Sequence, residues 1–126
     1  MKDAVLKDYR ICVLDDDADV LQSLRFLLET HGFTVRTFGD AAALLETIDP
    51  GEVDCLVVDY KMPRINGLEV AVRLRQRHMT APVILITGYP DRSLEARAAA
   101  AGIEHILLKP HLEDSLVACV RQLAGR

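Results

Sequence analysis

The sequence lacks the cysteine pattern of a disulfide-stabilised or zinc-binding protein. Its three cysteines, Cys12, Cys55 and Cys119, are odd in number, widely separated and set among apolar residues, and no two of them form a CxxC pair. We therefore expect free, buried thiols in a reducing compartment, which places the chain in the cytoplasm.

The chain also lacks a surplus of basic residues and long apolar runs. Lys and Arg total 15 against 19 Asp and Glu, giving a net charge of -4, so direct nucleic-acid binding by this domain is not indicated. No charged start followed by an apolar stretch opens the sequence, so we expect no signal peptide. The apolar runs are shorter than the ~18 residues that a membrane span needs, and we expect no membrane contact.

Linkers, internal repeats and low-complexity segments are absent as well. With 126 residues, 50% of them hydrophobic and 27% charged, the composition is that of an ordinary globular protein. This length fits one core, so we predict a single domain over residues 1–126 with its core at about 8–124.

Short apolar runs alternate with stretches of helical periodicity along the chain. The predicted strands cover residues 11–14, 33–38, 55–58, 83–86 and 106–108, and the predicted helices cover about 20–31, 41–48, 68–76, 94–101 and 112–124. Nearly continuous apolar strands indicate burial on both faces of a parallel sheet. We therefore predict a doubly wound α/β fold with five strands in the flavodoxin-like order 2-1-3-4-5 and five helices.

Polar residues follow four of the predicted strands directly. Asp15 and Asp16 end the first strand, Asp59 the third, Thr87 the fourth and Lys109 the fifth. The carboxyl ends of parallel strands meet at one edge of the sheet, where ligands of such folds bind. The sequence thus predicts three carboxylates, a hydroxyl and an amine at one edge.

This set of groups suits a phosphoryl group and a hard cation. Three neighbouring carboxylates repel one another, and Mg²⁺, which prefers oxygen ligands, relieves the repulsion. Lys109 and Thr87 supply a cation and a hydroxyl for phosphoryl oxygens. Asp59 can then act as the nucleophile, as carboxylates do in aspartyl-phosphate chemistry.

Four motifs, in order and in register with the strand–helix alternation, resemble the receiver domain of two-component response regulators. They are Leu14-Asp15-Asp16-Asp17, Val58-Asp59-Tyr60-Lys61-Met62-Pro63 with Asn66-Gly67, Ile86-Thr87-Gly88 and Leu108-Lys109-Pro110. The resemblance covers nearly the whole chain.

The resemblance implies a phosphoryl-accepting switch in a phosphorelay. Asp59 would take the phosphoryl group from a phosphohistidine of a sensor kinase or phosphotransfer protein. Asp15, Asp16 and Asp59 would hold Mg²⁺, with the backbone carbonyl of Lys61 as a further ligand. The switch would change the surface of the fourth helix, fifth strand and fifth helix, which an output domain, a partner protein or a second copy of the chain would read. Such a domain is not an enzyme beyond its own phosphorylation and slow autodephosphorylation.

Thr87 and Lys109 would bond the phosphoryl oxygens, and the Lys109–Pro110 peptide would be cis. Two positions depart from the common receiver pattern. Ile106 stands where many receivers have an inward-swinging Tyr or Phe, and His111 stands where Phe is frequent. The signal would therefore travel through backbone shifts of the loop after the fourth strand.

Lys61 and Tyr89 occupy the two variable positions that tune phosphoryl lifetime in the family. Both side chains are bulky, so we expect them to screen water from the acyl phosphate and to lengthen its life.

Two alternatives stay open from the sequence. The chain could be a receiver-fold adaptor that signals without phosphorylation, although its acidic set is intact. It could also be an aspartyl-nucleophile phosphohydrolase of the haloacid-dehalogenase type. That class needs a second acidic residue two positions after the nucleophile, where this chain has Lys61.

Overall fold

The computed structural model describes residues 8–89, 92–109 and 112–125. Its strands are β1 (Arg10–Leu14), β2 (Thr34–Phe38), β3 (Cys55–Asp59), β4 (Val83–Thr87) and β5 (His105–Leu108). Its helices are α1 (Ala18–Thr30), α2 (Ala41–Thr47), α3 (Gly67–Gln76), α4 (Arg92–Ala100) and α5 (Glu113–Ala124), with a short 3-10 turn, η2 (Pro50–Glu52), before β3.

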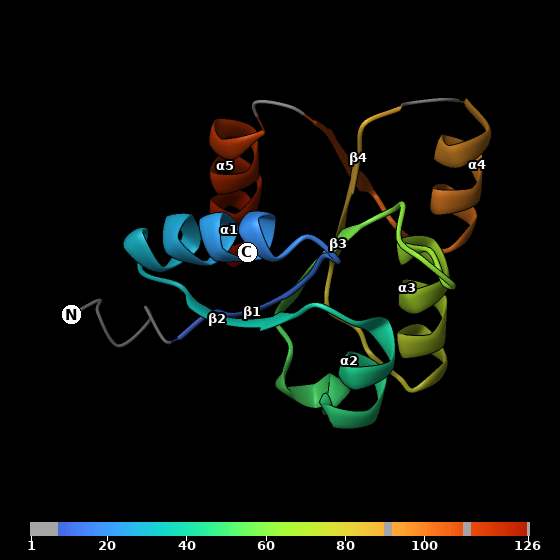
Figure 1. The fold of residues 1–126 in the computed structure, drawn as a ribbon, viewed down its shortest axis with the longest axis horizontal. Coiled ribbons are helices and arrows are strands. Elements are labelled where there is room, and N and C mark those ends of the chain that lie inside the picture. The colour runs from blue at the N-terminus through green and yellow to red at the C-terminus, as the bar shows by residue number, and fades with distance from the viewer. Residues whose placement is uncertain (1–7, 90–91, 110–111, 126) are drawn as a thin grey trace.

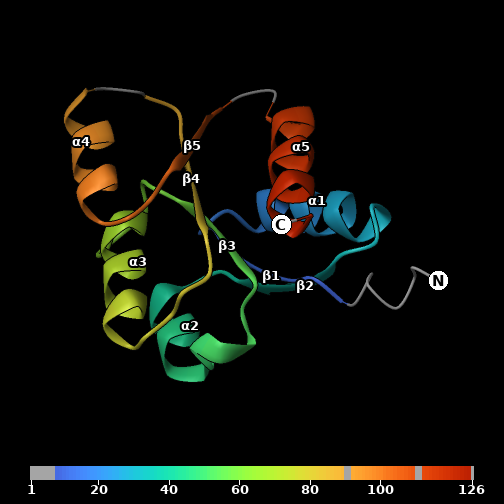
Figure 2. The ribbon, with the colours of Figure 1, turned by 180° about the vertical axis from the view of Figure 1, so that it is seen from behind.

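The five strands form one parallel sheet in the order β2-β1-β3-β4-β5 (Figures 1 and 2). In the central pairings, Leu14 lies beside Val58 and Asp59 lies beside Ile86, so β1, β3 and β4 end near one another. The predicted doubly wound fold and its strand order are confirmed. Among the described residues, none of the helices combines the length and apolar character needed to cross a membrane.

Helices cover both faces of the sheet. α1 and α5 lie together on one face, and α2, α3 and α4 lie on the other (Figure 1). Alternate side chains of each central strand enter the two cores, so that Val57 and Ile84 pack toward α1 and α5 while Val58 and Leu85 pack toward α2–α4. The apolar runs of the sequence reflect this burial on both sides.

Side-chain caps fix where three helices begin. Asp17 accepts hydrogen bonds from the backbone N–H groups of Asp19 and Val20, and Asp40 accepts one from Ala43. Asn66 is the N-cap of α3 and accepts from the N–H of Glu69 at 2.8 Å. These caps satisfy backbone donors that helix starts leave unpaired.

Two expectations of burial were wrong in part. Cys12 and Cys55 are buried free thiols, and burial raises the pKa of each to about 12, but Cys119 is partly exposed. β5 was expected to be buried on both faces, yet Leu108 is 47% exposed. The reason is position, because β5 forms an edge of the sheet and has a strand neighbour on one side alone.

Candidate functional site

The ends of β1, β3 and β4 bring the predicted polar residues to one edge of the sheet. Asp15 follows β1 and is 2% exposed, Asp59 ends β3 and is 5% exposed, and Thr87 ends β4 and is 3% exposed. Asp16 lies beside them and is exposed. Asp15, Asp59 and Thr87 are the buried polar or charged residues of the described chain. Buried polar groups of this kind need partners, so their clustering marks a site.

The carboxylates form a compact group. Each of Asp15, Asp16 and Asp59 offers an oxygen, and these oxygens all lie within 4.8 Å of one another. Lys109, just beyond β5, places its Nζ 3.1 Å from Oδ1 of Asp59 and 3.8 Å from Oδ2 of Asp15. The backbone N–H of Asp17 donates to Oδ1 of Asp15 at 2.9 Å, which orients that carboxylate.

Burial sets the protonation of these groups. It raises the pKa of Asp15 to about 6, with a further rise from the charge of Asp59, against the hydrogen bond from Asp17 and the charge of Lys109. Burial also raises the pKa of Asp59, although Lys109 opposes the shift. Burial by itself lowers the pKa of Lys109, but the carboxylates outweigh that effect and raise it above its ordinary value. Lys109 therefore stays charged, and one ammonium faces more than one carboxylate.

Thr87 makes its hydrogen bonds within its own loop. Its hydroxyl accepts a hydrogen bond from the backbone N–H of Tyr89 at 3.1 Å, and its Oγ1 lies 3.4 Å from the carbonyl oxygen of Tyr89. A phosphoryl oxygen that accepts from this hydroxyl must compete with the Tyr89 carbonyl, whereas the bond from the Tyr89 N–H can persist. This local pairing was not predicted from the sequence.

A cleft of about 420 Å³ opens above the group. It is lined by Asp15, Asp16, Asp17, Asp59, Tyr60, Lys61, Thr87, Gly88, Tyr89 and Lys109. All the residues predicted for the site are thus brought together, while their chemical roles stay predictions. Pro110 and His111, on which the cis-peptide expectation and one departure depend, lie outside the described residues.

Lys61 and Tyr89, the two positions expected to tune phosphoryl lifetime, line this cleft together with Gly88. Tyr89 is 77% exposed and Lys61 is exposed, so neither side chain is packed over the carboxylates. A Cβ added at Gly88 would meet no atom within 4 Å. The protein itself therefore does not require a glycine there, which is consistent with space kept for a ligand.

Gly67 supports the site in a way that the sequence did not reveal. A Cβ at Gly67 would collide with the backbone carbonyl oxygen of Asp59 and would lie 2.9 Å from Cγ2 of Val58. Its N–H donates to the carbonyl of Tyr60 at 2.8 Å. The start of α3 therefore packs directly on the end of β3, and a glycine is the residue that allows it.

The position of the usual aromatic switch is aliphatic here, and a different aromatic lies nearby. Ile106, on β5, is partly buried and packs against the core beneath α2–α4. Tyr60 packs on the same core, and Nη2 of Arg97, on α4, lies 3.0 Å from its Oη. The sequence did not predict this contact, because no local pattern links the two residues.

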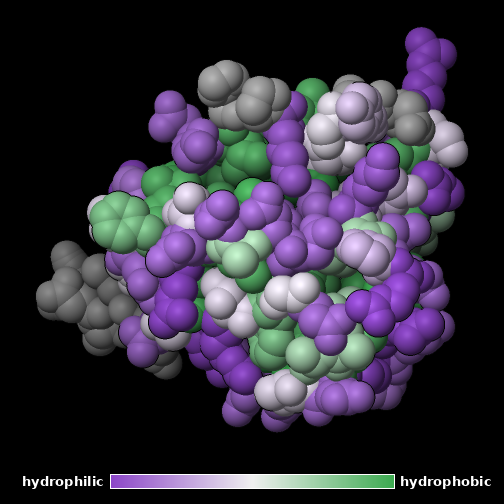
Figure 3. All heavy atoms as spheres, in the orientation of Figure 1, coloured by the Kyte–Doolittle hydropathy of each residue, from purple (hydrophilic) through white to green (hydrophobic). Residues whose placement is uncertain are grey.

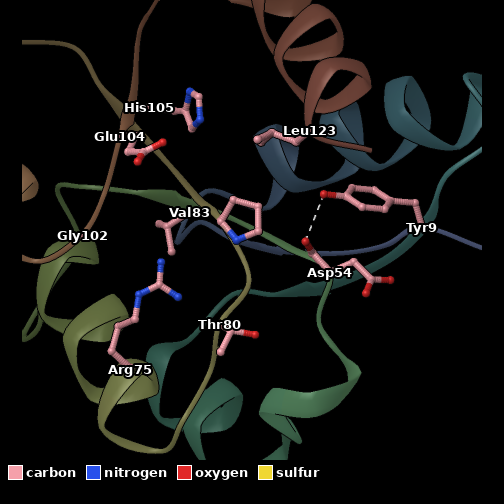
Figure 4. Close-up of a pocket in the computed structure, with 10 residues that line it drawn as sticks. Tyr9, Asp54, Arg75, Thr80, Val83, Gly102, Glu104, His105 and Leu123 are labelled. Carbon is pink, nitrogen blue, oxygen red and sulfur yellow. Dashed lines mark hydrogen bonds between the residues drawn. The ribbon is translucent and has the colours of Figure 1, made fainter. Parts of the chain in front are cut away.

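A second pocket, of about 450 Å³, lies at the opposite, amino ends of the strands (Figure 4). Some of its polar groups are already hydrogen-bonded: the Tyr9 hydroxyl donates to the Asp54 carbonyl at 3.0 Å, and Nη1 of Arg75 donates to the carbonyls of Met79 and Ala81. One exception is His105, whose Nε2 is buried and has no hydrogen-bond partner in the described structure. The pocket offers a structural network and no nucleophile comparable to Asp59.

The acidic group fits a divalent cation. Its ligands are oxygens, they converge within 4.8 Å, and burial leaves their mutual repulsion poorly screened. Mg²⁺ binds such carboxylates and keeps water in its remaining positions. Asp15, Asp16 and Asp59 are the residues that could hold it, with Lys61 in the same cleft.

Comparison with known proteins agrees with this geometry. The family model described as the response regulator receiver domain matches residues 11–121. The transcriptional regulatory protein FixJ of Azorhizobium caulinodans is 40% identical over 114 residues, covering 90% of this chain and 54% of that protein. The chain thus spans about half the length of the curated relatives it matches.

Solved structures give the same result. The crystal structure of FixJ-N superposes with a TM-score of 0.82 at 29% identity, covering 95% of this chain and 96% of that one. The response regulator TrrA from Thermotoga maritima, solved in complex with Mg²⁺-BeF, has a TM-score of 0.79 at 29% identity, covering 90% and 97%. With its sheet order, its acidic edge and these matches in agreement, the chain belongs to the response regulator receiver domain family.

Proposed function

We propose that this chain is a phosphoryl-accepting switch in which Asp59 takes a phosphoryl group from the phosphohistidine of a sensor kinase or phosphotransfer protein. The observation that supports this most is the convergence of three carboxylates with Nζ of Lys109, which lies 3.1 Å from Oδ1 of Asp59. The related TrrA was solved with Mg²⁺-BeF, which is consistent with such a site.

Asp59 acts as the nucleophile. One of its carboxylate oxygens attacks phosphorus, an O–P bond forms, and the P–N bond of the phosphohistidine breaks with its electron pair going to the leaving imidazole nitrogen. The carboxyl must be ionised to attack. Burial raises its pKa, and the Lys109 ammonium opposes this shift, so Lys109 keeps the nucleophile available.

The remaining groups neutralise charge and position the phosphoryl group. Asp15, Asp16, Asp59 and the Lys61 carbonyl would hold Mg²⁺, which would supply positive charge to the phosphoryl oxygens. Lys109 binds one phosphoryl oxygen. Thr87 donates its hydroxyl to another in place of its contact with the Tyr89 carbonyl.

The signal is read at the surface of α4, β5 and α5. Leu108 on β5 is 47% exposed and can contact an output domain, a partner protein or a second copy of the chain. Hydrophilic side chains cover most of the face in Figure 3, with hydrophobic ones in small groups among them. We place the switch in the cytoplasm, and it is not an enzyme beyond its own phosphorylation and slow autodephosphorylation.

Intact mass measured after incubation with acetyl phosphate and Mg²⁺ tests the proposal. Wild type should gain ~80 Da, the mass of one phosphoryl group, and Asp59→Asn should gain nothing. A matched control is Asp54→Asn, which removes a carboxylate just before the other end of β3 and should still be phosphorylated. Chelating the metal should prevent the gain in every variant.

Beryllofluoride binding is measured as well, because a short-lived phosphoryl adduct could be lost before its mass is recorded. A wild type that neither gains mass nor binds beryllofluoride with Mg²⁺ would be a receiver-fold adaptor. A gain that persists in Asp59→Asn would move the acceptor to another residue.

Sedimentation with and without beryllofluoride tests dimerisation, and an unchanged monomer would contradict it.

A further inference from the structure

Tyr60, the residue directly after Asp59, is tied to α4 by Arg97. Nη2 of Arg97 lies 3.0 Å from the Tyr60 hydroxyl, and the Arg97 guanidinium carbon lies 5.8 Å from the centre of the Tyr60 ring. One side chain of α4 thus makes both a hydrogen bond and a cation–π contact with the residue next to the phosphoryl acceptor. α4 approaches the acceptor through this pair.

The Tyr60 end of this pair is fixed. Its backbone N–H donates to the carbonyl of Ile86 in β4 at 2.8 Å, and its carbonyl accepts from Gly67 at the start of α3 at 2.8 Å. Its ring packs against the core beneath α2–α4. Tyr60 cannot shift without disturbing β4 and α3 together.

α4, which carries Arg97, is packed less tightly against the rest of the domain. Of the nine residues of α4, Leu94 and Ala98 are buried, whereas five residues of α3 are buried. A helix with little buried apolar surface opens and shifts at low cost. α4 also follows the loop in which the Thr87 hydroxyl is bonded to the Tyr89 backbone.

We propose that Tyr60 and Arg97 are positioning residues whose contact brakes the switch by favouring the unphosphorylated arrangement of α4. This inference rests on the proposed function. A phosphoryl oxygen that accepts a hydrogen bond from the Thr87 hydroxyl displaces its contact with the Tyr89 carbonyl, and the loop and the α4 that follows it shift. Because Tyr60 stays fixed, the shift breaks its contact with Arg97. The cost of breaking it lowers the affinity of the site for a phosphoryl group.

The same contact bears on the absence of an aromatic residue at position 106, where this chain has Ile106. An aliphatic side chain on β5 has no hydroxyl and no ring to carry a rotamer change to the surface. The pair formed by Tyr60 and Arg97 joins the acceptor loop to α4 directly, on the same core that Ile106 contacts. The acceptor loop is therefore linked to α4 without a β5 aromatic, and this link opposes the shift of α4.

The test is the dissociation constant of beryllofluoride, measured with Mg²⁺ on the whole chain. Arg97→Gln removes both contacts and should bind beryllofluoride roughly threefold to tenfold more tightly, the range expected for losing one exposed hydrogen bond and one cation–π contact. Tyr60→Phe keeps the ring and should show part of this gain. Arg97→Lys keeps the charge over the ring and should lie between Arg97→Gln and wild type.

The double variant and a control separate coupling from general loosening. Tyr60→Phe combined with Arg97→Gln should bind no more tightly than Arg97→Gln alone, because the two residues share one interaction. Arg73→Gln removes an exposed arginine from α3, where it pairs with Glu69 at 3.1 Å, and should leave the constant unchanged. Unfolding midpoints of these exposed-arginine variants should stay within about 3 °C of wild type.

The outcomes distinguish a failure of this inference from a failure of the proposed function. If wild type binds beryllofluoride and Arg97→Gln binds equally or more weakly, the contact between Tyr60 and Arg97 does not oppose activation. The proposed phosphoryl-accepting function is unaffected by that result. If wild type neither binds beryllofluoride nor is phosphorylated, the proposed function fails, and the brake fails with it. A gain in Arg73→Gln equal to that in Arg97→Gln also overturns the brake, since the effect would then be one of surface charge.

Discussion

The two ends of the sheet handle charge differently. At the amino end, the carboxylate of Asp54 receives the backbone N–H, Nε and Nη2 of Arg10 at 2.8, 2.9 and 3.1 Å, and these contacts lower its pKa. At the carboxyl end, Asp15 and Asp59 share Lys109, and burial raises the pKa of both. The clefts at the two ends have similar volumes, about 450 and 420 Å³, but the Asp54 charge is already paired. Unbalanced charge therefore distinguishes the end where a ligand is needed.

The largest effect should come from neutralising Asp15, and it should have the opposite sign to most core substitutions. Its folded pKa of about 6 lies above its ordinary 3.8, so the folded state binds more protons between these values. This group therefore costs stability increasingly as pH rises from about 4 to 6, and the full cost persists above 6. Without metal at pH 7.5, Asp15→Asn should raise the free energy of unfolding by about 1 to 3 kcal/mol.

Urea unfolding at pH 7.5 and pH 4, with and without Mg²⁺, measures this effect. The gain should shrink toward zero at pH 4, and Mg²⁺ should stabilise wild type more than Asp15→Asn. A loss of stability at pH 7.5 without metal would mean that the carboxylate is well paired in the free protein, as Asp54 is.

Substitutions at two glycines beside the cleft should show separate effects on folding and on ligand binding. Gly67→Ala should lower the free energy of unfolding by about 1 to 3 kcal/mol, because its Cβ meets the Asp59 carbonyl and Val58. Gly88→Ala has open space and should change stability by under about 0.5 kcal/mol, while slowing phosphorylation by acetyl phosphate. If the two variants unfold alike, close packing of α3 on β3 is not what requires Gly67.

At the amino end of the sheet, removing the charge of Asp54 should lower stability only slightly. Asp54→Asn should lower the free energy of unfolding by about 0.5 to 1 kcal/mol, since its ion pair with Arg10 is partly exposed. The pKa of Asp54 is lowered in the folded state, so its contribution is present above pH ~4 and is lost as pH falls through the folded value. Unfolding at pH 7 and pH 2 measures the loss, and an equal difference between wild type and variant at both would contradict the pairing.

The smallest effect should be on the lifetime of the phosphoryl group. Replacing Lys61 or Tyr89 by Ala should speed its hydrolysis about threefold, under 1 kcal/mol in the barrier, if these side chains screen it from water. Loss of the ~80 Da adduct over time measures the rate. Because Tyr89 is 77% exposed before phosphorylation, an unchanged rate would mean that it does not close over the site.

Much of the fold and the grouping of the site residues follow from sequence. Short apolar strands that end in Asp, Thr or Lys are local patterns, and the parallel topology then brings those ends to one edge. The Tyr60–Arg97 contact, the close approach of Gly67 to Asp59 and the pairing of Thr87 with Tyr89 were not predicted. Each depends on distances between elements, or on a rotamer, that no periodicity encodes. The exposure of Leu108 was missed because an edge strand and a central strand have similar sequences.

The sparse packing of α4 also bears on how such a domain diversifies. Of its nine residues, Leu94 and Ala98 are buried, so most of its positions can change with little effect on folding. After a gene duplication, a copy could acquire a new partner through this helix while its acidic edge stayed intact. Recognition and phosphoryl chemistry would then evolve under separate constraints within a single domain.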